Sequence, residues 1–309
     1  MKKLAIVGPG AMGILFAYLL KPVFDEVVLI DYLSERAEII SKRGIKIETS
    51  EGIKTEKIKA TAQPEELGAV DLVMLCVKAY STRSALEHAL PIIADHSLVL
   101  SLQNGLGNVE VMAELVGNDK VLAGTTSMGA NLVETGYVRF AGAGETVIGE
   151  LSGGTERAKL VAEKFEKAGL EVKVTDNLLG TIWSKVLINV GINALTALIR
   201  VQNGKLLYFE ETKTLLKEAV LEAQKVAQAK GIKLLYDDAV AKVEEVARRT
   251  AENISSMLQD VRAKRQTEID AINGAIVREG EKLGIECPVN RVLTLLVRAV
   301  QASYSDQIN

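Results

Sequence analysis

The chain has 309 residues, of which 48% are hydrophobic, so it can bury more apolar surface than one core usually holds, and two domains are expected. Its formal net charge of −3 and sequence pI of about 5.7, with acidic and basic residues interspersed, exclude the strongly basic surface of a nucleic-acid-binding protein. Two scattered cysteines exclude a disulfide framework and fit a cytoplasmic protein, and the two histidines have no cysteine or carboxylate at ligand spacing, so no metal site is expected.

The N-terminal part of the sequence alternates between strand and helix patterns. Residues 3–7 and 26–30 are short apolar runs typical of strands, and residues 11–20 and 34–43 have helical patterns. The first 20 residues have some features of a signal peptide, but a Gly-Pro-Gly sequence interrupts the apolar run, which favours a strand, a turn and a helix. No apolar stretch reaches the roughly 20 residues that span a bilayer, so no membrane segment is expected.

Further strands are predicted in the next 80 residues. Residues 45–60 alternate apolar and polar side chains around a Glu-Gly pair, as a hairpin does. The apolar run of residues 70–77 is typical of a strand buried on both faces, and residues 97–102 and 121–127 have strand patterns too. Because these strands alternate with helices, we predict a parallel, doubly wound sheet.

The pattern changes along the second half of the chain. Residues 137–151 predict another glycine-containing hairpin, followed by an amphipathic helix over residues 155–169 and a short strand over residues 171–175. From Asp176 onward the strand signals fade and the pattern is helical. The longest predicted helix covers residues 237–264.

The change near Thr175 is the predicted domain boundary. The expected fold is an α/β N-terminal domain over residues 1–175 and an all-α C-terminal domain over residues 176–309.

A glycine-rich loop joins the first strand to the first helix. In the G-x-G-x-x-G spacing, the first glycine permits a tight turn, the second lets the backbone approach a pyrophosphate, and the third lets helix and strand pack closely. The helix N-terminus favours the phosphate charge. The alternative, a purely structural glycine turn, agrees less well with the strand and helix on either side. The predicted cofactor-binding residues of this loop are Gly8, Pro9, Gly10, Ala11, Met12 and Gly13.

Asp31 ends the second predicted strand, 18 residues after Gly13. A carboxylate at this position can accept hydrogen bonds from the adenosine ribose of NAD, and it repels the 2′-phosphate of NADP. Arg36 could instead pair with a 2′-phosphate, or cover the adenine. We predict a preference for NADH.

Polar side chains also follow two other predicted strands. Lys78 comes after residues 70–77, and Gln103 and Asn104 come after residues 97–102. Taken separately, the Asn-Gly pair is a turn signal and Lys78 is a solvated lysine. Ligands of such sheets bind outside the carboxyl ends of the strands, so together with the glycine loop these residues predict a cofactor site there.

A polar stripe crosses the apolar segment of residues 183–198. Lys185, Asn189 and Asn193 are four residues apart, which places them on one face of a helix. Lys185 could direct its ammonium group to solvent, and the asparagines could be satisfied core amides. Three such groups on one buried face are costly without partners, so we predict a site for a hydroxyl, ketone or carboxylate ligand.

The sequence resembles the ketopantoate reductase (2-dehydropantoate 2-reductase) family in motifs that extend over nearly the whole chain. In chain order they are GPGAMG, VKA, QNG, WSKVLINVGINALTAL, ENISSMLQDV and TEIDAINGAIVREGEKLGIECPVN. The resemblance implies NAD(P)H-dependent reduction of 2-dehydropantoate to pantoate in coenzyme A biosynthesis. It also implies that residues 1–175 form an α/β N-terminal Rossmann-type dinucleotide-binding domain, that residues 176–309 form an all-α C-terminal domain that binds the substrate, and that a cleft lies between them. The helical domain could also supply a homodimer interface.

The resemblance also implies roles for individual residues. Lys185 matches the general acid, Glu268 a glutamate near the cofactor and that lysine, Lys78 a lysine facing the cofactor, and Asn104 a residue that touches cofactor and substrate. A lysine ammonium can protonate the alkoxide that forms when hydride adds to a ketone. Well-known members of the family use NADPH and carry a basic residue where this chain has Asp31.

Four further residues match positions at which the family holds its substrate: Asn189, Asn193, Asn203 and Ser256. In a plainer interpretation, Ser256 lies on a helix surface and Glu268 pairs with Arg265. Ser256 and Glu268 would be about 18 Å apart along a continuous helix, so they can share a cleft only if the helix runs along it or breaks between them.

Two other functions stay open at the level of sequence. The motifs fix a lysine and several amides but not the acyl group around them, so the substrate could be another small 2-keto or 2-hydroxy acid. A non-catalytic dinucleotide-binding sensor would bind the cofactor without turnover. The complete set of Lys185, Asn189, Asn193 and Glu268 argues against the sensor.

Overall fold

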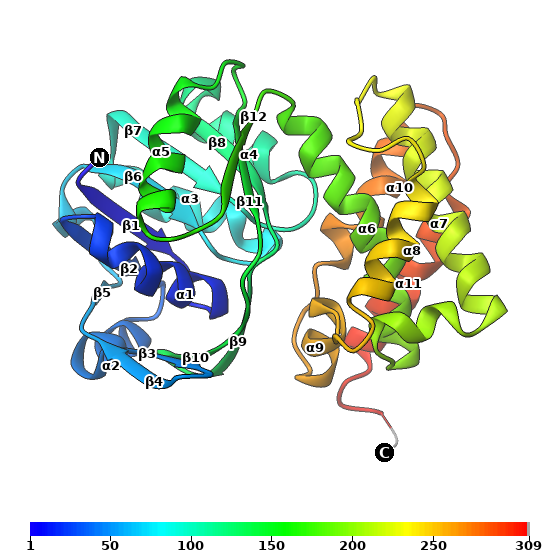
Figure 1. The fold of residues 1–309 in the computed structure, drawn as a ribbon, viewed down its shortest axis with the longest axis horizontal. Helices are drawn as coiled ribbons and strands as arrows, with labels where there is room; N and C mark the ends of the chain where they lie inside the picture. Colours follow the sequence, from blue (N-terminus) through cyan, green and yellow to red (C-terminus); the bar gives the residue numbers. More distant parts are fainter. Residues whose placement is uncertain (308–309) are drawn as a thin grey trace. The chain divides into compact units, whose positions relative to one another are not determined.

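The computed structural model describes residues 1–307, which fold into two compact units (Figure 1). The first unit comprises residues 1–103 and 108–178, and the second comprises residues 104–107 together with the chain from Leu179 onward. The first is α/β and the second is helical, which confirms the predicted fold class. The predicted boundary after Thr175 coincides with the end of a strand, and the functional roles assigned to the two domains stay predictions.

The first unit is built on an eight-stranded sheet in the order β12-β11-β8-β7-β6-β1-β2-β5. Its strands are β1 (Lys3–Val7), β2 (Glu26–Ile30), β5 (Lys59–Thr61), β6 (Val70–Leu75), β7 (Ile93–Ser101), β8 (Val121–Thr126), β11 (Thr146–Glu150) and β12 (Val172–Thr175). β1 pairs in parallel with β2 on one side and with β6 on the other. The strand order therefore reverses beside β1, and such a reversal is where doubly wound sheets bind their ligands.

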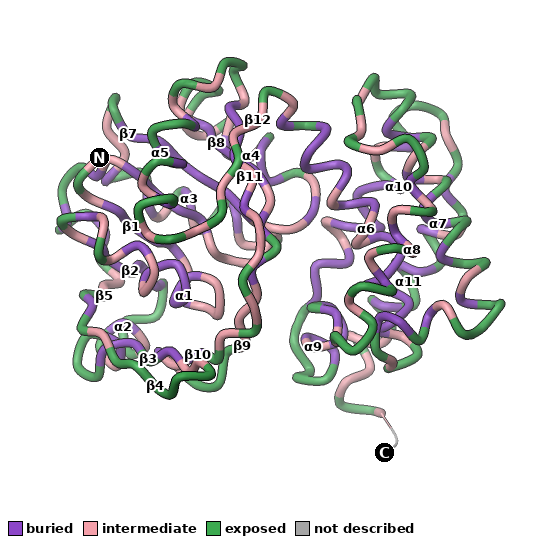
Figure 2. The backbone as a smooth tube through the Cα atoms, in the orientation of Figure 1, coloured by how far each residue is buried: buried purple, intermediate pink, exposed green. Residues whose placement is uncertain are grey.

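Helices cover this sheet. They are α1 (Ala11–Leu20), α2 (Ser34–Arg43), α3 (Thr82–Ala89), α4 (Asn108–Val116) and α5 (Glu156–Lys167), with short 3-10 turns η1 (Lys21–Val23), η2 (Pro64–Leu67), η3 (Ala79–Ser81), η4 (Leu90–Ile92) and η5 (Asn118–Lys120). The core forms because apolar strand residues such as Leu4 and Ile6 are fully buried against helix residues such as Phe16 (Figure 2). Phe16 and Phe165 bring α1 and α5 together, with ring centroids 5.9 Å apart.

A second sheet of four strands, in the order β4-β3-β10-β9, completes the first unit. Its strands are β3 (Ile45–Thr49), β4 (Gly52–Glu56), β9 (Gly129–Glu134) and β10 (Tyr137–Gly142). The antiparallel pair β3 and β4 confirms the predicted hairpin over residues 45–60.

The predicted hairpin over residues 137–151 is wrong. β10 pairs with β9 and β3 in the small sheet, whereas β11 pairs with β8 and β12 in the large one. The glycines between them let the chain pass from one sheet to the other: Gly142 has φ +152°, and a Cβ on Gly144 would lie 2.7 Å from the Ser127 carbonyl oxygen. These glycines therefore lie where the chain passes between the two sheets, and not in the turn of a hairpin.

The second unit consists of helices packed around α6. Its helices are α6 (Leu178–Ile199), α7 (Glu210–Ala229), α8 (Ala239–Arg249), α9 (Ser256–Arg262), α10 (Asn273–Lys282) and α11 (Pro288–Ala302), with the 3-10 turns η6 (Asn203–Leu207) and η7 (Ile269–Ala271). By length and composition α6 could span a membrane, so the prediction that no stretch reaches that length is wrong. Most of α6 is buried inside the unit, as expected of a core helix.

The predicted continuous helix over residues 237–264 is wrong as well. It is divided into α8 and α9, and the residues between them bond to η6: the Asn203 amide donates to the Asn253 carbonyl at 3.0 Å, and the Gly204 amide to the Ala251 carbonyl at 3.1 Å. The Ser255 hydroxyl then accepts from the Leu258 amide and begins α9. Tertiary hydrogen bonds and a serine cap therefore interrupt a sequence that contains no glycine or proline.

Candidate active site

The glycine loop between β1 and α1 has three glycines in three different environments. A Cβ on Gly8, where φ is +95°, would lie 2.6 Å from Val77 Cγ1, and one on Gly13 would lie 2.1 Å from the Gly8 carbonyl oxygen. At Gly10 no atom of the described chain beyond the adjoining residues lies within 4 Å of a Cβ position. The fold therefore requires Gly8 and Gly13, while Gly10 leaves open space at the start of α1, as a pyrophosphate cradle needs.

Asp31 and Arg36 form an ion pair at the carboxyl end of β2. Arg36 Nε lies 2.8 Å and Nη2 2.6 Å from the two oxygens of Asp31, and the Leu33 amide also donates to this carboxylate. The Asp31 side chain is fully buried, whereas that of Arg36 is 41% exposed and its guanidinium lies 5.3 Å from the Tyr32 ring centroid. Arg36 is therefore the member of the pair that is exposed to solvent, and Asp31 holds it in place. The sequence did not indicate this ion pair.

Gln103 organises the ends of β6 and β7. Its side-chain amide donates to the Val77 carbonyl at 2.7 Å and to the Thr82 hydroxyl at 2.9 Å, and its carbonyl oxygen accepts from Ser101. Lys78 follows Val77 directly, so Gln103 fixes the loop that carries this lysine. A polar residue at a strand end was the only sequence signal for this role.

The loop of residues 104–107 belongs to the second unit although both of its neighbours in sequence belong to the first. The Leu106 amide donates to the Ala271 carbonyl at 2.8 Å. Gly105, with φ +89°, passes so close to η7 that a Cβ would lie 2.6 Å from that of Ala271. The Asn-Gly pair is therefore more than a turn, since it holds half-buried Asn104 in the unit that contains Glu268.

Lys185 and Glu268 interact electrostatically within the second unit. Lys185 is half-buried on α6, and Glu268 is 7% exposed at the start of η7. Burial lowers the pKa of Lys185 to about 8, and the negative charge of Glu268 opposes that shift. The lysine therefore stays mostly protonated at neutral pH, yet it releases its proton more readily than a solvated lysine does.

Two of the candidate asparagines have unused hydrogen-bonding atoms. Asn189 Nδ2 and Asn203 Oδ1 are buried and have no hydrogen-bond partner among residues 1–307, although Asn203 Nδ2 donates to the Thr250 hydroxyl at 3.0 Å. Asn193 is 5% exposed on the same helix. Because buried polar atoms are nearly always paired in proteins, the two free atoms indicate that a ligand or water completes this region.

The residues predicted for catalysis and substrate binding lie on different elements of the second unit. Lys185, Asn189 and Asn193 share α6, and Glu268 acts on the first of them. Ser256 begins α9 and is exposed. α9 ends at Arg262, before Glu268, which is one of the two conditions under which the sequence allowed Ser256 and Glu268 to share a cleft. The role of each residue stays a proposal.

Comparison with known proteins identifies the family. Residues 4–153 match the model of the family described as ketopantoate reductase PanE/ApbA, and residues 177–301 match its C-terminal model. The chain belongs to the ketopantoate reductase family. It is 39% identical over 301 residues to a 2-dehydropantoate 2-reductase of Halobacterium salinarum, with 97% of this chain and 99% of the relative covered.

Solved structures extend the family comparison to the fold. A ketopantoate reductase of Ralstonia eutropha is 34% identical with a TM-score of 0.89, and coverage is 97% of this chain and 99% of the other. The structure of a D-mandelate dehydrogenase with NADH and anilino(oxo)acetate is 32% identical with a TM-score of 0.92 and the same coverage. This fold therefore occurs in proteins named for two different acids.

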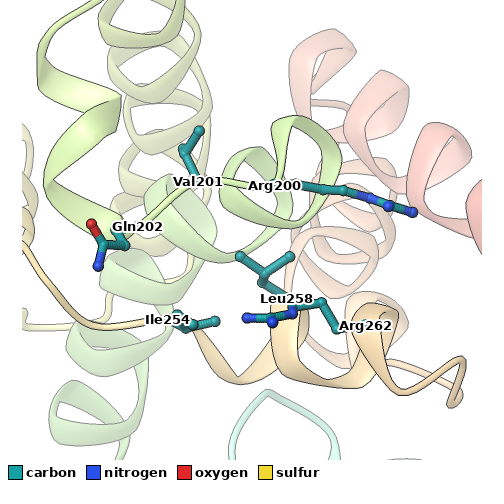
Figure 3. A pocket seen from close by; sticks show the side chains of 6 residues that line it. All are labelled: Arg200, Val201, Gln202, Ile254, Leu258 and Arg262. Carbon is teal, nitrogen blue, oxygen red and sulfur yellow. The ribbon is translucent and has the colours of Figure 1, made fainter.

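A cavity of about 270 Å³ lies between the end of α6 and α9 (Figure 3). Its lining residues are Arg200, Val201, Gln202, Ile254, Leu258 and Arg262. None of them was a predicted site residue. Among residues 1–307, no group of three or more His, Cys, Asp or Glu side chains could hold a metal ion.

Replacing Gly105 by alanine should destabilise the second unit of this ketopantoate reductase homologue by about 2–4 kcal/mol, since it adds both a left-handed non-glycine residue and a collision with Ala271. Gly107→Ala is the matched control, because Gly107 has φ +96° but no atom of the described chain within 4 Å of a Cβ position. That control should cost only about 1 kcal/mol. Urea unfolding measures both, and equal losses would contradict the contact argument.

Proposed function

We propose that this chain reduces 2-dehydropantoate to pantoate with a nicotinamide dinucleotide, the step that belongs to coenzyme A biosynthesis. The observation that carries the proposal is the pairing of Lys185, whose pKa lies near 8, with the Glu268 carboxylate. The pair lies in a chain that is 39% identical to a protein named for this reaction. A proton donor tuned in this way suits a carbonyl reduction.

The glycine loop fits the cofactor. The open space at Gly10 and the close packing at Gly8 and Gly13 match a pyrophosphate cradle. When bound, the reduced nicotinamide supplies the hydride. The residues proposed to hold the dinucleotide are Gly8, Pro9, Gly10, Ala11, Met12, Gly13, Asp31, Lys78, Asn104 and Glu268.

The second unit supplies the acid and the substrate contacts. The Lys185 ammonium donates a proton to the ketone oxygen as negative charge develops there, and Glu268 keeps the lysine protonated beforehand. Amide and hydroxyl groups hold the carboxylate, ketone and hydroxyl of the keto acid. The residues proposed for this are Asn104, Lys185, Asn189, Asn193, Asn203 and Ser256.

The proposed cofactor preference is for NADH, because Asp31 places a negative charge where NADP carries its 2′-phosphate. The D-mandelate dehydrogenase with a TM-score of 0.92 was solved with NADH, which supports this choice. The exposed Arg36 guanidinium moderates the preference by neutralising the carboxylate.

Asp31→Asn should move the ratio of kcat/KM for NADH over NADPH toward NADPH by about tenfold, since it removes the repulsion and frees Arg36 for a 2′-phosphate. Arg36→Ala should move the ratio in the opposite direction. Steady-state kinetics with both cofactors measures the two shifts. A ratio unchanged in both variants would remove this pair from cofactor selection.

The test of the main proposal is nicotinamide oxidation with 2-dehydropantoate, using NADH and NADPH in parallel. Turnover is the expected result, and no turnover with either cofactor would overturn the proposal. The similarity to a D-mandelate dehydrogenase makes reduction of another 2-keto acid the second candidate. A higher kcat/KM for an aryl 2-keto acid than for 2-dehydropantoate would favour that candidate.

We further propose that the protein acts in the cytoplasm on a free small molecule, with neither nucleic acid nor membrane as a partner. Cys76 and Cys287 are both free thiols, which fits a reducing compartment. The helical unit is proposed to supply a homodimer interface, and sedimentation equilibrium of the whole chain tests this.

A further inference from the structure

Buried hydrogen bonds join the start of α9 to the last turn of α6. The Leu258 amide lies 3.1 Å from Ser255 Oγ, which lies 2.7 Å from Thr196 Oγ1. Thr196 Oγ1 in turn lies 2.9 Å from the Ile192 carbonyl oxygen and 3.0 Å from that of Asn193. Thr196 is 0% exposed and Ser255 is 6% exposed, so water has little access to these bonds.

The direction of the bonds follows from which groups carry protons. A carbonyl oxygen only accepts, so the single hydroxyl proton of Thr196 is directed at the carbonyls of its own helix. Ser255 must then donate its proton to Thr196, while it accepts from the Leu258 amide. These hydrogen bonds through Ser255 and Thr196 are here called the hydroxyl relay. Each hydroxyl proton in it is already used in a hydrogen bond, so a methyl group in place of either hydroxyl breaks the relay.

The relay connects two residues proposed to hold the keto acid. One end is the backbone carbonyl of Asn193, and the other is the turn in which Ser256 directly follows Ser255. The cavity lined by Val201 and Leu258 lies at the same end of these two elements. Figure 3 shows the side chains of Ile254 and Leu258, on either side of Ser255 in the sequence, at this cavity.

We propose that Thr196 and Ser255 are positioning residues for the substrate: their hydroxyl relay fixes Ser256 relative to Asn193. The inference rests on the proposed function of those two residues. Buried apolar residues such as Met257 and Val261 also hold α9 in place. Apolar packing is not directional, whereas a hydrogen bond has a narrow range of lengths and angles. The relay therefore determines the register of α9 on α6.

Thr196→Val and Thr196→Ser test the relay as a matched pair, since valine keeps the shape and loses the hydroxyl whereas serine keeps the hydroxyl. The valine variant should raise KM for 2-dehydropantoate about 3- to 10-fold, the effect of one buried hydrogen bond, with KM for the dinucleotide unchanged. The serine variant should be close to wild type. Ser255→Gly, which still permits the helix start, should reproduce the valine result.

The decisive measurement repeats Thr196→Val in a Ser256→Ala background. If the relay acts through Ser256, the valine substitution should no longer change KM there. A full KM increase in that background, or no increase in wild type, overturns the proposal.

Amide hydrogen exchange of Leu258 is a readout that does not depend on turnover. Its protection should fall in Thr196→Val and persist in Thr196→Ser, and unchanged protection in the valine variant overturns the relay. If wild type does not reduce 2-dehydropantoate, the proposed function fails, and this exchange measurement still decides whether the relay exists.

Discussion

Lys185→Ala should lose about 10²- to 10⁴-fold in kcat for ketone reduction, because it removes the group proposed to protonate the developing alkoxide. No other lysine is proposed for this proton transfer, and water is a weaker and less well-placed acid. Stopped-flow and steady-state oxidation of the nicotinamide with 2-dehydropantoate measure the loss. Lys217→Ala, at an exposed position on α7, is the control and should keep wild-type turnover.

The pH profile separates an acid from a merely structural lysine. Burial lowers the pKa of Lys185 to about 8, so the ammonium form is present below that pH and is lost above it. The rate of reduction should therefore be level at neutral pH and fall on the alkaline side. Because the Glu268 charge raises this pKa, Glu268→Gln should move the alkaline limb to lower pH.

Two results would contradict this assignment. Near wild-type turnover in Lys185→Ala, with the urea midpoint unchanged, would show that another group supplies the proton. An alkaline limb that stayed in place in Glu268→Gln would show that the carboxylate does not tune the lysine.

The local elements of the first unit could be predicted because each is encoded within its own few residues. The strand at residues 3–7 and the helix at residues 11–20 have the predicted bounds, since an apolar run, a glycine turn and a helical pattern follow one another there. The polar stripe on α6 could be predicted for the same reason, because the four-residue spacing is itself local.

Strand partners and helix breaks could not be predicted in this way. Alternation indicates that residues 137–151 form strands but not which strands they pair with, and β10 and β11 enter different sheets. The helical pattern continues through residues 250–255, and hydrogen bonds from the distant η6 interrupt it, with Ser255 capping the helix that follows. Both errors concern contacts between residues far apart in the sequence.

In the candidate site, too, local features could be predicted and contacts between distant residues could not. The four-residue spacing singled out Lys185, and the resemblance added Glu268 as a glutamate near it. The structure adds that burial lowers the pKa of Lys185 and that the charge of Glu268 opposes this shift. Gln103 was predicted only as a polar residue at a strand end, and its hydrogen bonds to the Val77 carbonyl and the Thr82 hydroxyl could not be predicted. Thr196 drew no functional interpretation, because a buried hydroxyl looks like any other polar residue until its partners are known.

Gly10→Val should weaken dinucleotide binding about 10- to 100-fold while leaving the fold intact. The backbone at Gly10 is extended, with φ −79° and ψ −165°, which valine adopts readily. No atom beyond the adjoining residues lies within 4 Å of the new Cβ in the described chain, so the added side chain starts in the space proposed for the pyrophosphate. Cofactor titration by nicotinamide fluorescence measures affinity, and urea unfolding measures stability.

Gly13→Ala is the comparison variant, because its added Cβ collides with the protein itself and not with the space proposed for the cofactor. Its Cβ would lie 2.1 Å from the Gly8 carbonyl oxygen, so α1 must move away from β1 and the free energy of unfolding should fall by about 1–3 kcal/mol. Loss of binding without loss of stability is therefore expected at Gly10, and loss of both at Gly13. If Gly10→Val bound the dinucleotide normally, the pyrophosphate would not lie at this loop, and the cofactor proposal would lose its main geometric support.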